Sequence, residues 1–410
     1  MHLSDFKKTG HTPTLFSAFL YFDISFMVWV LLGPLAVFIT EDFHLSPAQK
    51  GMLVALPILG GAFLRLVLGA MTDRIGAKKT ALIGLGVTLV PLLWGWLGAR
   101  SLNELYLVGL LLGMGGASFA AALPMASRWY PPEHQGLAMG IAGAGNSGTV
   151  LAALFAPRLA RHFGDWHIVF ALAMIPVVIV WLIVALLAKD SPDRPAPKSM
   201  GEYLGVLKEP DTLWFCLFYS ITFGGFVGLA SFLPTFFKDQ YQLDKIQAGN
   251  FTALCVFAGS FVRPIGGYLA DRFGGVRMLV LLYSLIGVLA FFIAQLPSFP
   301  VATALLFLLM ATLGCGNGSV FQLVPQRFPR QIGVITGIVG AAGGIGGFCL
   351  PSLLGYLKGM AGSFGGGFAA FAIAAACCIG LMLALHPVWQ RAGWLGAGGR
   401  AVLIPAGAED

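Results

Sequence analysis

Apolar runs of 18 or more residues recur along almost the whole of this 410-residue chain. Such runs predict helices that cross a bilayer, because lipid leaves a helix or a closed barrel as the only structures that satisfy the backbone. Only 10% of the residues are charged, whereas a soluble domain carries about 25%. We therefore predict an all-α polytopic membrane protein with twelve transmembrane helices. The expected helices cover residues 13–38, 47–71, 80–98, 103–124, 135–159, 167–188, 212–236, 246–270, 277–296, 300–322, 333–357 and 365–386.

Lysine and arginine are distributed unevenly over the predicted loops. With the N-terminus placed inside, most of the 25 basic residues lie in cytoplasmic loops and tails. This bias fits the positive-inside rule with both termini cytoplasmic and an even number of spans. It predicts a multi-pass protein of the cytoplasmic membrane, and it accounts for the net charge of +7 without nucleic-acid binding. The polar first dozen residues predict no cleaved signal peptide.

Two arginines, Arg65 and Arg263, stand inside apolar stretches 198 residues apart, and a similar motif follows each. Residues 20–26 likewise match residues 217–223 at an offset of 197. Repeats that run in the same direction predict two pseudo-symmetric six-helix bundles with a binding site between them, near the middle of the membrane.

A polar, proline-containing stretch at the midpoint of the chain predicts a linker between the bundles, with a short surface helix from residue 200 to 207. We expect five parts. They are an N-terminal cytoplasmic tail (1–12), a first bundle (13–188), a cytoplasmic linker (189–211), a second bundle (212–387) and a C-terminal cytoplasmic tail (388–410).

The two arginines predict an anion-binding site. An arginine near the middle of a bilayer costs about 2.5–3.5 kcal/mol on insertion scales. Of the 18 acidic residues, only Asp23 falls well inside a span, so one cation remains without a carboxylate. An anionic ligand would remove the imbalance, and the guanidinium fork suits a planar oxyanion. Structural pairing or capping by backbone carbonyls is the alternative.

The repeated motif Gly-x-x-x-Asp-Arg-x-Gly is predicted at the cytoplasmic ends of the second and eighth helices. We interpret it as a gate or conformational latch, with a plain charged turn as the alternative. Its residues are Gly69, Asp73, Arg74 and Gly76 in the first copy and Gly267, Asp271, Arg272 and Gly274 in the second.

Two glycine-rich runs lie in the fifth and eleventh helices. In lipid, glycine allows helix backbones to approach closely, so tight packing is the simplest interpretation. The glycines concerned are Gly143, Gly145, Gly148, Gly340, Gly343, Gly344, Gly346 and Gly347. Asn146 differs, because a buried amide needs a partner and its N–H groups suit an oxyanion.

Four further residues near the repeats are candidates. Phe119 and Phe223 are explained by core packing or by contact with a ligand, and the hydroxyl of Tyr219 must find a partner if it is buried. Asp23 is the candidate for carrying a proton, or alternatively for neutralising an arginine.

On these residues the chain resembles the major facilitator superfamily, and within it the nitrate/nitrite porter family. The midpoint linker and both Asp-Arg-x-Gly motifs carry the first resemblance. The paired arginines and the glycine-rich runs carry the second. The resemblance implies transport of nitrate or nitrite by alternating access, with Arg65 and Arg263 flanking the anion. It also implies that Asn146, Tyr219, Phe223 and Phe119 line the same pocket. The family holds both exchangers and proton symporters, so coupling stays open.

Other functions remain to be separated. A transporter of another small anion, such as a carboxylate, is the nearest alternative, and a channel or a transport-like receptor is more distant. Midplane arginines suit neither a cation nor a neutral solute. An enzyme is disfavoured because the spans show no metal-ligand cluster and no nucleophile–base pair. The six cysteines lie inside predicted helices as apolar fillers. We expect no cofactor, no metal ion, and a monomer in the lipid bilayer.

Overall fold

The computed structural model describes residues 10–130, 132–191, 200–328 and 332–395. Twelve of its helices or helix pairs are long and apolar enough to cross a membrane, which confirms the predicted all-α fold with twelve spans. Most of the expected tails at 1–12 and 388–410, and the middle of the expected linker, lie outside the described residues.

In the first half of the chain, three spans contain a break. The first consists of α2 (Thr12–Trp29) and α3 (Leu32–Phe43), the fourth of α6 (Leu102–Ala117) and α7 (Phe119–Ser127). The fifth consists of α8 (Pro132–Gly143), the 3-10 turn η1 (Ala144–Ser147) and α9 (Gly148–Phe163). The other three spans are α4 (Pro47–Ile75), α5 (Ala77–Leu97) and α10 (His167–Leu187).

In the second half, each span is one continuous helix. These helices are α12 (Pro210–Tyr241), α13 (Lys245–Phe273), α14 (Gly275–Ala294), α15 (Phe299–Arg327), α16 (Ile332–Ala361) and α17 (Gly365–Arg391). The short helix α11 (Met200–Leu207) precedes them, as the sequence predicted.

The breaks follow from local chemistry that the hydropathy pattern does not show. Pro34 has no N–H to donate to the carbonyl of Val30, which accepts instead from the amide of Gly33 (2.9 Å). The helix therefore tightens and re-forms as α3. In the fifth span, the glycine-rich segment with its poor helix propensity takes the 3-10 form at η1.

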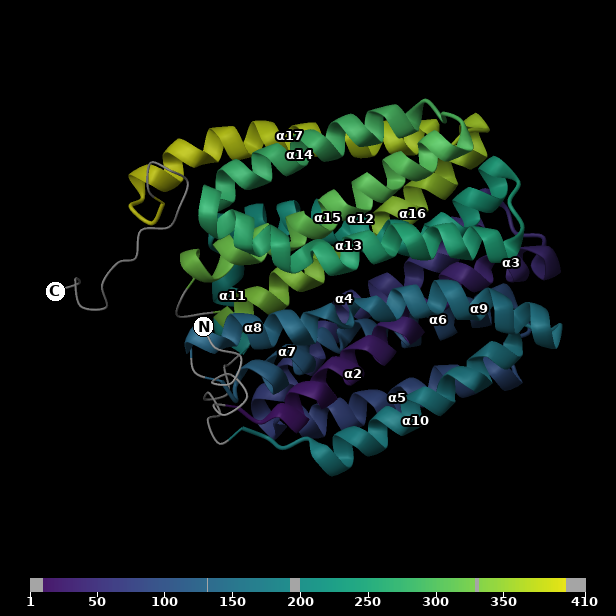
Figure 1. Cartoon of the computed structure of the whole chain (residues 1–410), viewed down its shortest axis with the longest axis horizontal. Helices are drawn as coiled ribbons and strands as arrows, with labels where there is room; N and C mark the ends of the chain where they lie inside the picture. The colour runs from purple at the N-terminus through teal and green to yellow at the C-terminus, as the bar shows by residue number, and fades with distance from the viewer. Residues whose placement is uncertain (1–9, 131, 192–199, 329–331, 396–410) are drawn as a thin grey trace.

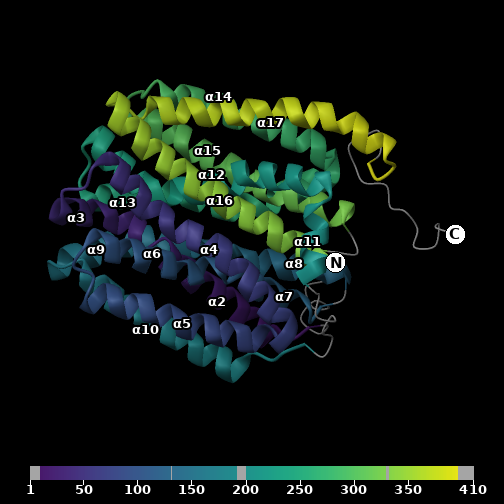
Figure 2. The ribbon, with the colours of Figure 1, turned by 180° about the vertical axis from the view of Figure 1, so that it is seen from behind.

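The spans form two bundles that lie side by side, with the purple-to-blue helices below and the green-to-yellow helices above (Figure 1). The first and seventh spans are central, with 89% and 78% of their most apolar window buried, whereas the sixth and twelfth are outermost, with 33% and 28%. The agreement between the halves is the internal symmetry that the repeats predicted. At the interface, α4 packs against α16, α13 against α9 and α12 against α3 (Figure 2).

We call the end of the molecule where α2 begins and α17 ends the terminal end, and the opposite end the distal end (Figure 1). Because the number of spans is even, the chain enters and leaves the described structure on the same side.

Candidate functional site

Arg65 lies on α4 with 1% of its surface exposed. Its Nη1 donates to the carbonyl of Gly340 on α16 (2.5 Å), and its Nη2 donates to the carbonyl of Gly116 on α6 (2.9 Å). Its Nε is buried without a hydrogen-bond partner. Carbonyl capping, one of the alternatives, therefore accounts for two of the three guanidinium nitrogens and leaves Nε without a partner.

Arg263 lies on α13 and is half-buried. Its Nη2 donates to the hydroxyl of Tyr219 on α12 (3.4 Å), while its Nη1 is buried without a partner. Among the described residues, no Asp or Glu comes within ion-pair distance of either arginine. Two buried or half-buried positive charges thus face the bundle interface without a carboxylate.

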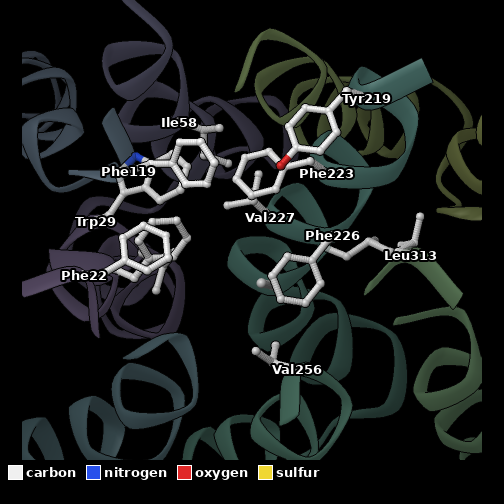
Figure 3. Packing of buried hydrophobic residues seen from close by; sticks show 14 of the residues in the cluster. Phe22, Trp29, Ile58, Phe119, Tyr219, Phe223, Phe226, Val227, Val256 and Leu313 are labelled. Carbon is white, nitrogen blue, oxygen red and sulfur yellow. The ribbon is translucent and has the colours of Figure 1, made fainter. Parts of the chain in front are cut away.

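An aromatic shell encloses the two guanidinium groups. The Cζ of Arg65 lies 5.0 Å from the ring centre of Phe119, and that of Arg263 lies 5.8 Å from the same ring. Phe223 lies 5.5 Å from the Cζ of Arg65 and stacks on Tyr219 at 5.1 Å. Phe119 and Phe223 face each other from the two bundles (Figure 3). Rings in this position stabilise a cation and also exclude water around it.

Two aromatic residues of this shell were missed from the sequence. Phe321 of α15 lies 4.7 Å from Tyr219 and 6.1 Å from Phe119 between ring centres. Trp29 of α2 stacks on Phe223 at 6.4 Å. Nothing local distinguishes Phe321 among the 33 phenylalanines of the chain.

Asn146 lies in η1 and is buried, and its Oδ1 has no hydrogen-bond partner. Its main-chain carbonyl accepts from Ser260 of the other bundle at 3.5 Å. The contact with Ser260 places Asn146 at the interface between the bundles. Its side chain forms no hydrogen bond with Arg65 or Arg263 in the described structure, and its Oδ1 has no partner there.

Asp23 of α2 is 7% exposed and accepts a hydrogen bond from the hydroxyl of Ser147 (2.6 Å). It forms no ion pair with Arg65 or Arg263 in the described structure, so it does not neutralise an arginine here. Its partner lies in the glycine-rich segment, which links this carboxylate to the first glycine run.

Each glycine run brings its own helix close to the first helix of the same bundle, at corresponding positions in the two halves. A Cβ on Gly148 would lie 1.8 Å from the carbonyl oxygen of Asp23, and a Cβ on Gly346 would lie 2.3 Å from that of Ser220. Asp23 and Ser220 are 197 residues apart, which is the repeat offset. A Cβ would meet a neighbour within 3.0 Å at five further positions, which are Gly145, Gly340, Gly343, Gly344 and Gly347. Around Gly143 there is open space.

The two charged motifs lie at the terminal end, and their surroundings differ. Asp73 is ion-paired with Arg128 of the same bundle (2.7 Å), whereas Asp271 is exposed. Gly76 and Gly274 adopt φ of +97° and +95°, which only glycine adopts without strain. The remaining motif residues lie at the ends of α4 and α13 and are Gly69, Arg74, Gly267 and Arg272.

Residues 17–351 match the family model of the Major Facilitator Superfamily. The chain belongs to this superfamily. It is therefore a transporter and not an enzyme, and its curated relatives place it in the nitrate/nitrite porter family. A "Nitrite extrusion protein" of Bacillus subtilis is 33% identical over 89% of this chain and 92% of the relative. A "Probable nitrate/nitrite transporter NarK2" of Mycobacterium tuberculosis is 37% identical over 81% and 85%. A "Probable nitrate/nitrite antiporter NarK1" of Thermus thermophilus is 30% identical over 87% of both chains.

The same fold appears among solved structures. A bacterial homologue of the human lysosomal transporter Spinster, in an inward-facing and occupied conformation, superposes with a TM-score of 0.66. The superposition covers 95% of this chain and 98% of the other at 18% identity. It supports the two-bundle facilitator fold.

Proposed function

We propose that this transporter moves nitrate or nitrite across the cytoplasmic membrane by alternating access, with the anion held between Arg65 and Arg263. One observation carries the proposal. The two arginines meet at the Phe119 ring, and each keeps a buried donor without a partner, Nε of Arg65 and Nη1 of Arg263. With no carboxylate in reach among the described residues, a small anion supplies the missing charge. The relatives named above as nitrate or nitrite transporters agree with this assignment.

The shape of the site favours a small planar oxyanion. Guanidinium groups present hydrogen-bond donors in one plane, which matches two oxygens of nitrate or nitrite. The rings of Phe119, Phe223 and Tyr219 enclose the guanidinium groups. We assign Asn146 to the same pocket, where its amide would donate to the anion once the bundles rearrange.

Alternating access is supported by the way the distal end is closed. Lys50 pairs with Asp239 across the bundles (2.6 Å), and Glu41 bonds with both Lys238 and Lys245. We place the terminal end in the cytoplasm because the basic residues concentrate there. In this assignment the structure is closed to the outside. Residues 13–188 and 212–387 move as units around the linker at 189–211, and the motifs of Asp73 and Asp271 act as latches at the cytoplasmic end.

The test is uptake and counterflow of labelled nitrate and nitrite in proteoliposomes. Arg65→Lys and Arg263→Lys should each lower uptake by at least about tenfold although the charge is kept, because the donor fork is lost. Arg100→Lys, at an exposed position of a distal loop, is the matched control and should transport normally. Competition by unlabelled anions separates nitrate from a carboxylate as the substrate. If unlabelled formate or oxalate blocks the uptake and unlabelled nitrate does not, the substrate is a carboxylate. Flux without counterflow acceleration would indicate a channel, and binding without flux a receptor.

A further inference from the structure

Asn317 of α15 is a second buried amide near the arginines. It is 1% exposed, and its Oδ1 has no hydrogen-bond partner. A buried polar atom without a partner is costly, so an Asn in the middle of a membrane span indicates a partner in another state of the transport cycle. Hydropathy did not single it out, although residues 314–317 repeat the Gly-x-Gly-Asn pattern of residues 143–146.

The position of Asn317 on α15 places it beside the anion site. It lies four residues before Phe321, hence on the same face of the helix, and the Phe321 ring contacts both Phe119 and Tyr219. The next residue, Gly318, packs directly on Arg263, because a Cβ there would lie 2.3 Å from the Arg263 carbonyl oxygen.

The internal symmetry gives Asn317 a counterpart in the first bundle. A Cβ on Gly115 would lie 2.4 Å from the carbonyl oxygen of Ser25, and a Cβ on Gly316 would lie 2.6 Å from Thr222. Ser25 and Thr222 are 197 residues apart, which is the repeat offset. Gly115 and Gly316, which are 201 residues apart, thus pack against corresponding residues of the first and seventh spans.

The next residues along the two helices are Gly116 and Asn317. The Gly116 carbonyl accepts the hydrogen bond from Nη2 of Arg65 (2.9 Å). In the second bundle, Oδ1 of Asn317 and Nη1 of Arg263 are both buried without a hydrogen-bond partner.

We propose that Asn317 is the positioning residue for Arg263. When the anion is bound, Oδ1 of Asn317 accepts from one N–H of Arg263 Nη1 and leaves the second N–H of that nitrogen for the anion. This bond fixes the plane of the guanidinium, as the Gly116 carbonyl does for Arg65. The inference rests on the proposed anion site. It predicts that the amide side chain of Asn317 on α15 affects the affinity for a planar oxyanion.

Binding of nitrate to the purified protein in lipid nanodiscs, measured by isothermal titration calorimetry, tests the proposal. Asn317→Leu should weaken nitrate affinity by about tenfold or more. Asn317→Asp, nearly the same shape, should abolish binding because its carboxylate neutralises Arg263. Thr312→Val, on the same helix with its hydroxyl bonded to the Leu308 carbonyl (2.7 Å), should leave the affinity unchanged.

A double-mutant cycle between Asn317→Leu and Arg263→Lys shows whether Asn317 acts through Arg263. We expect the double variant to lose little more affinity than Arg263→Lys alone. Additive losses of nitrate affinity would overturn the positioning role. Normal nitrate binding by Asn317→Asp would overturn it as well. The Asn317→Asp variant also decides the question if Asn317→Leu does not fold. If the unmodified protein binds no nitrate or nitrite, it is the proposed function that fails.

Discussion

Nη1 of Arg65 donates a hydrogen bond of 2.5 Å to the carbonyl of Gly340, which belongs to the other bundle. The charge that we assign to anion binding is thus bonded across the surface where the two bundles meet. A ligand that draws Arg65 toward itself competes with this bond, so occupancy of the site and the contact between the bundles are physically linked.

Gly340→Ala should therefore impair transport, because a Cβ at this position would lie 2.9 Å from Nη1 of Arg65. Displacing the guanidinium or overpacking its surroundings costs about 1–3 kcal/mol, which corresponds to a loss of roughly 5- to 150-fold in nitrate affinity. Gly337→Ala on the same helix is the control, since open space surrounds Gly337. Equal nitrate binding by the two variants, measured by calorimetry, would contradict the role of the Arg65–Gly340 contact.

Asp23→Asn separates exchange from proton coupling. An asparagine keeps an oxygen that accepts from Ser147, so the contact of 2.6 Å can persist. We expect nitrate/nitrite counterflow to continue, while accumulation of nitrate under an imposed pH gradient is lost. Ser147→Ala removes the hydrogen bond but not the carboxylate, and it should retain accumulation. Unchanged accumulation in Asp23→Asn proteoliposomes would remove Asp23 from the coupling role.

Glu41→Gln should loosen the distal closure, because Glu41 bonds with Lys238 and Lys245 of the opposite bundle. Glu41 is 53% exposed, and exposed ion pairs contribute about 0–1 kcal/mol each. The population open at the distal end should rise by a few-fold.

Spin labels at the exposed residues His162 and Gln247, one on each bundle, report the opening as a longer distance in pulsed electron paramagnetic resonance. Asp165→Asn, also distal and 56% exposed but paired within its own bundle, should leave the distance distribution unchanged. A distribution in Glu41→Gln identical to that of the unmodified protein would show that these pairs do not hold the distal end closed.

Gly148→Ala should destabilise the first bundle, because its Cβ would lie 1.8 Å from the carbonyl oxygen of Asp23. The helices must separate locally, at a cost of about 1–3 kcal/mol or more. Gly140→Ala, in open space, is the matched substitution and should melt close to the unmodified protein. Thermal unfolding followed by tryptophan fluorescence gives the comparison, and coincident melting curves for the two variants would contradict the close-packing explanation.

The twelve spans, their approximate ends and the duplication could all be predicted from the sequence. Hydropathy is a local property, and a helix in lipid satisfies its own backbone, so each span is determined by its own residues. Arg65 and Arg263 were identifiable for a related reason, since a charge in an apolar run stands out wherever the helix later packs. The repeated offset then indicated that the two arginines belong to one site.

Only the tertiary structure determined what surrounds those charges. Gly340 lies 275 residues from Arg65 along the chain, and Phe321 contacts Phe119 and Tyr219 because of how α15 packs beside α13. The closure of the distal end by Glu41 and Lys238 likewise depends on how the two bundles meet. Such contacts arise from the relative placement of whole helices, which no local pattern of hydropathy or spacing specifies.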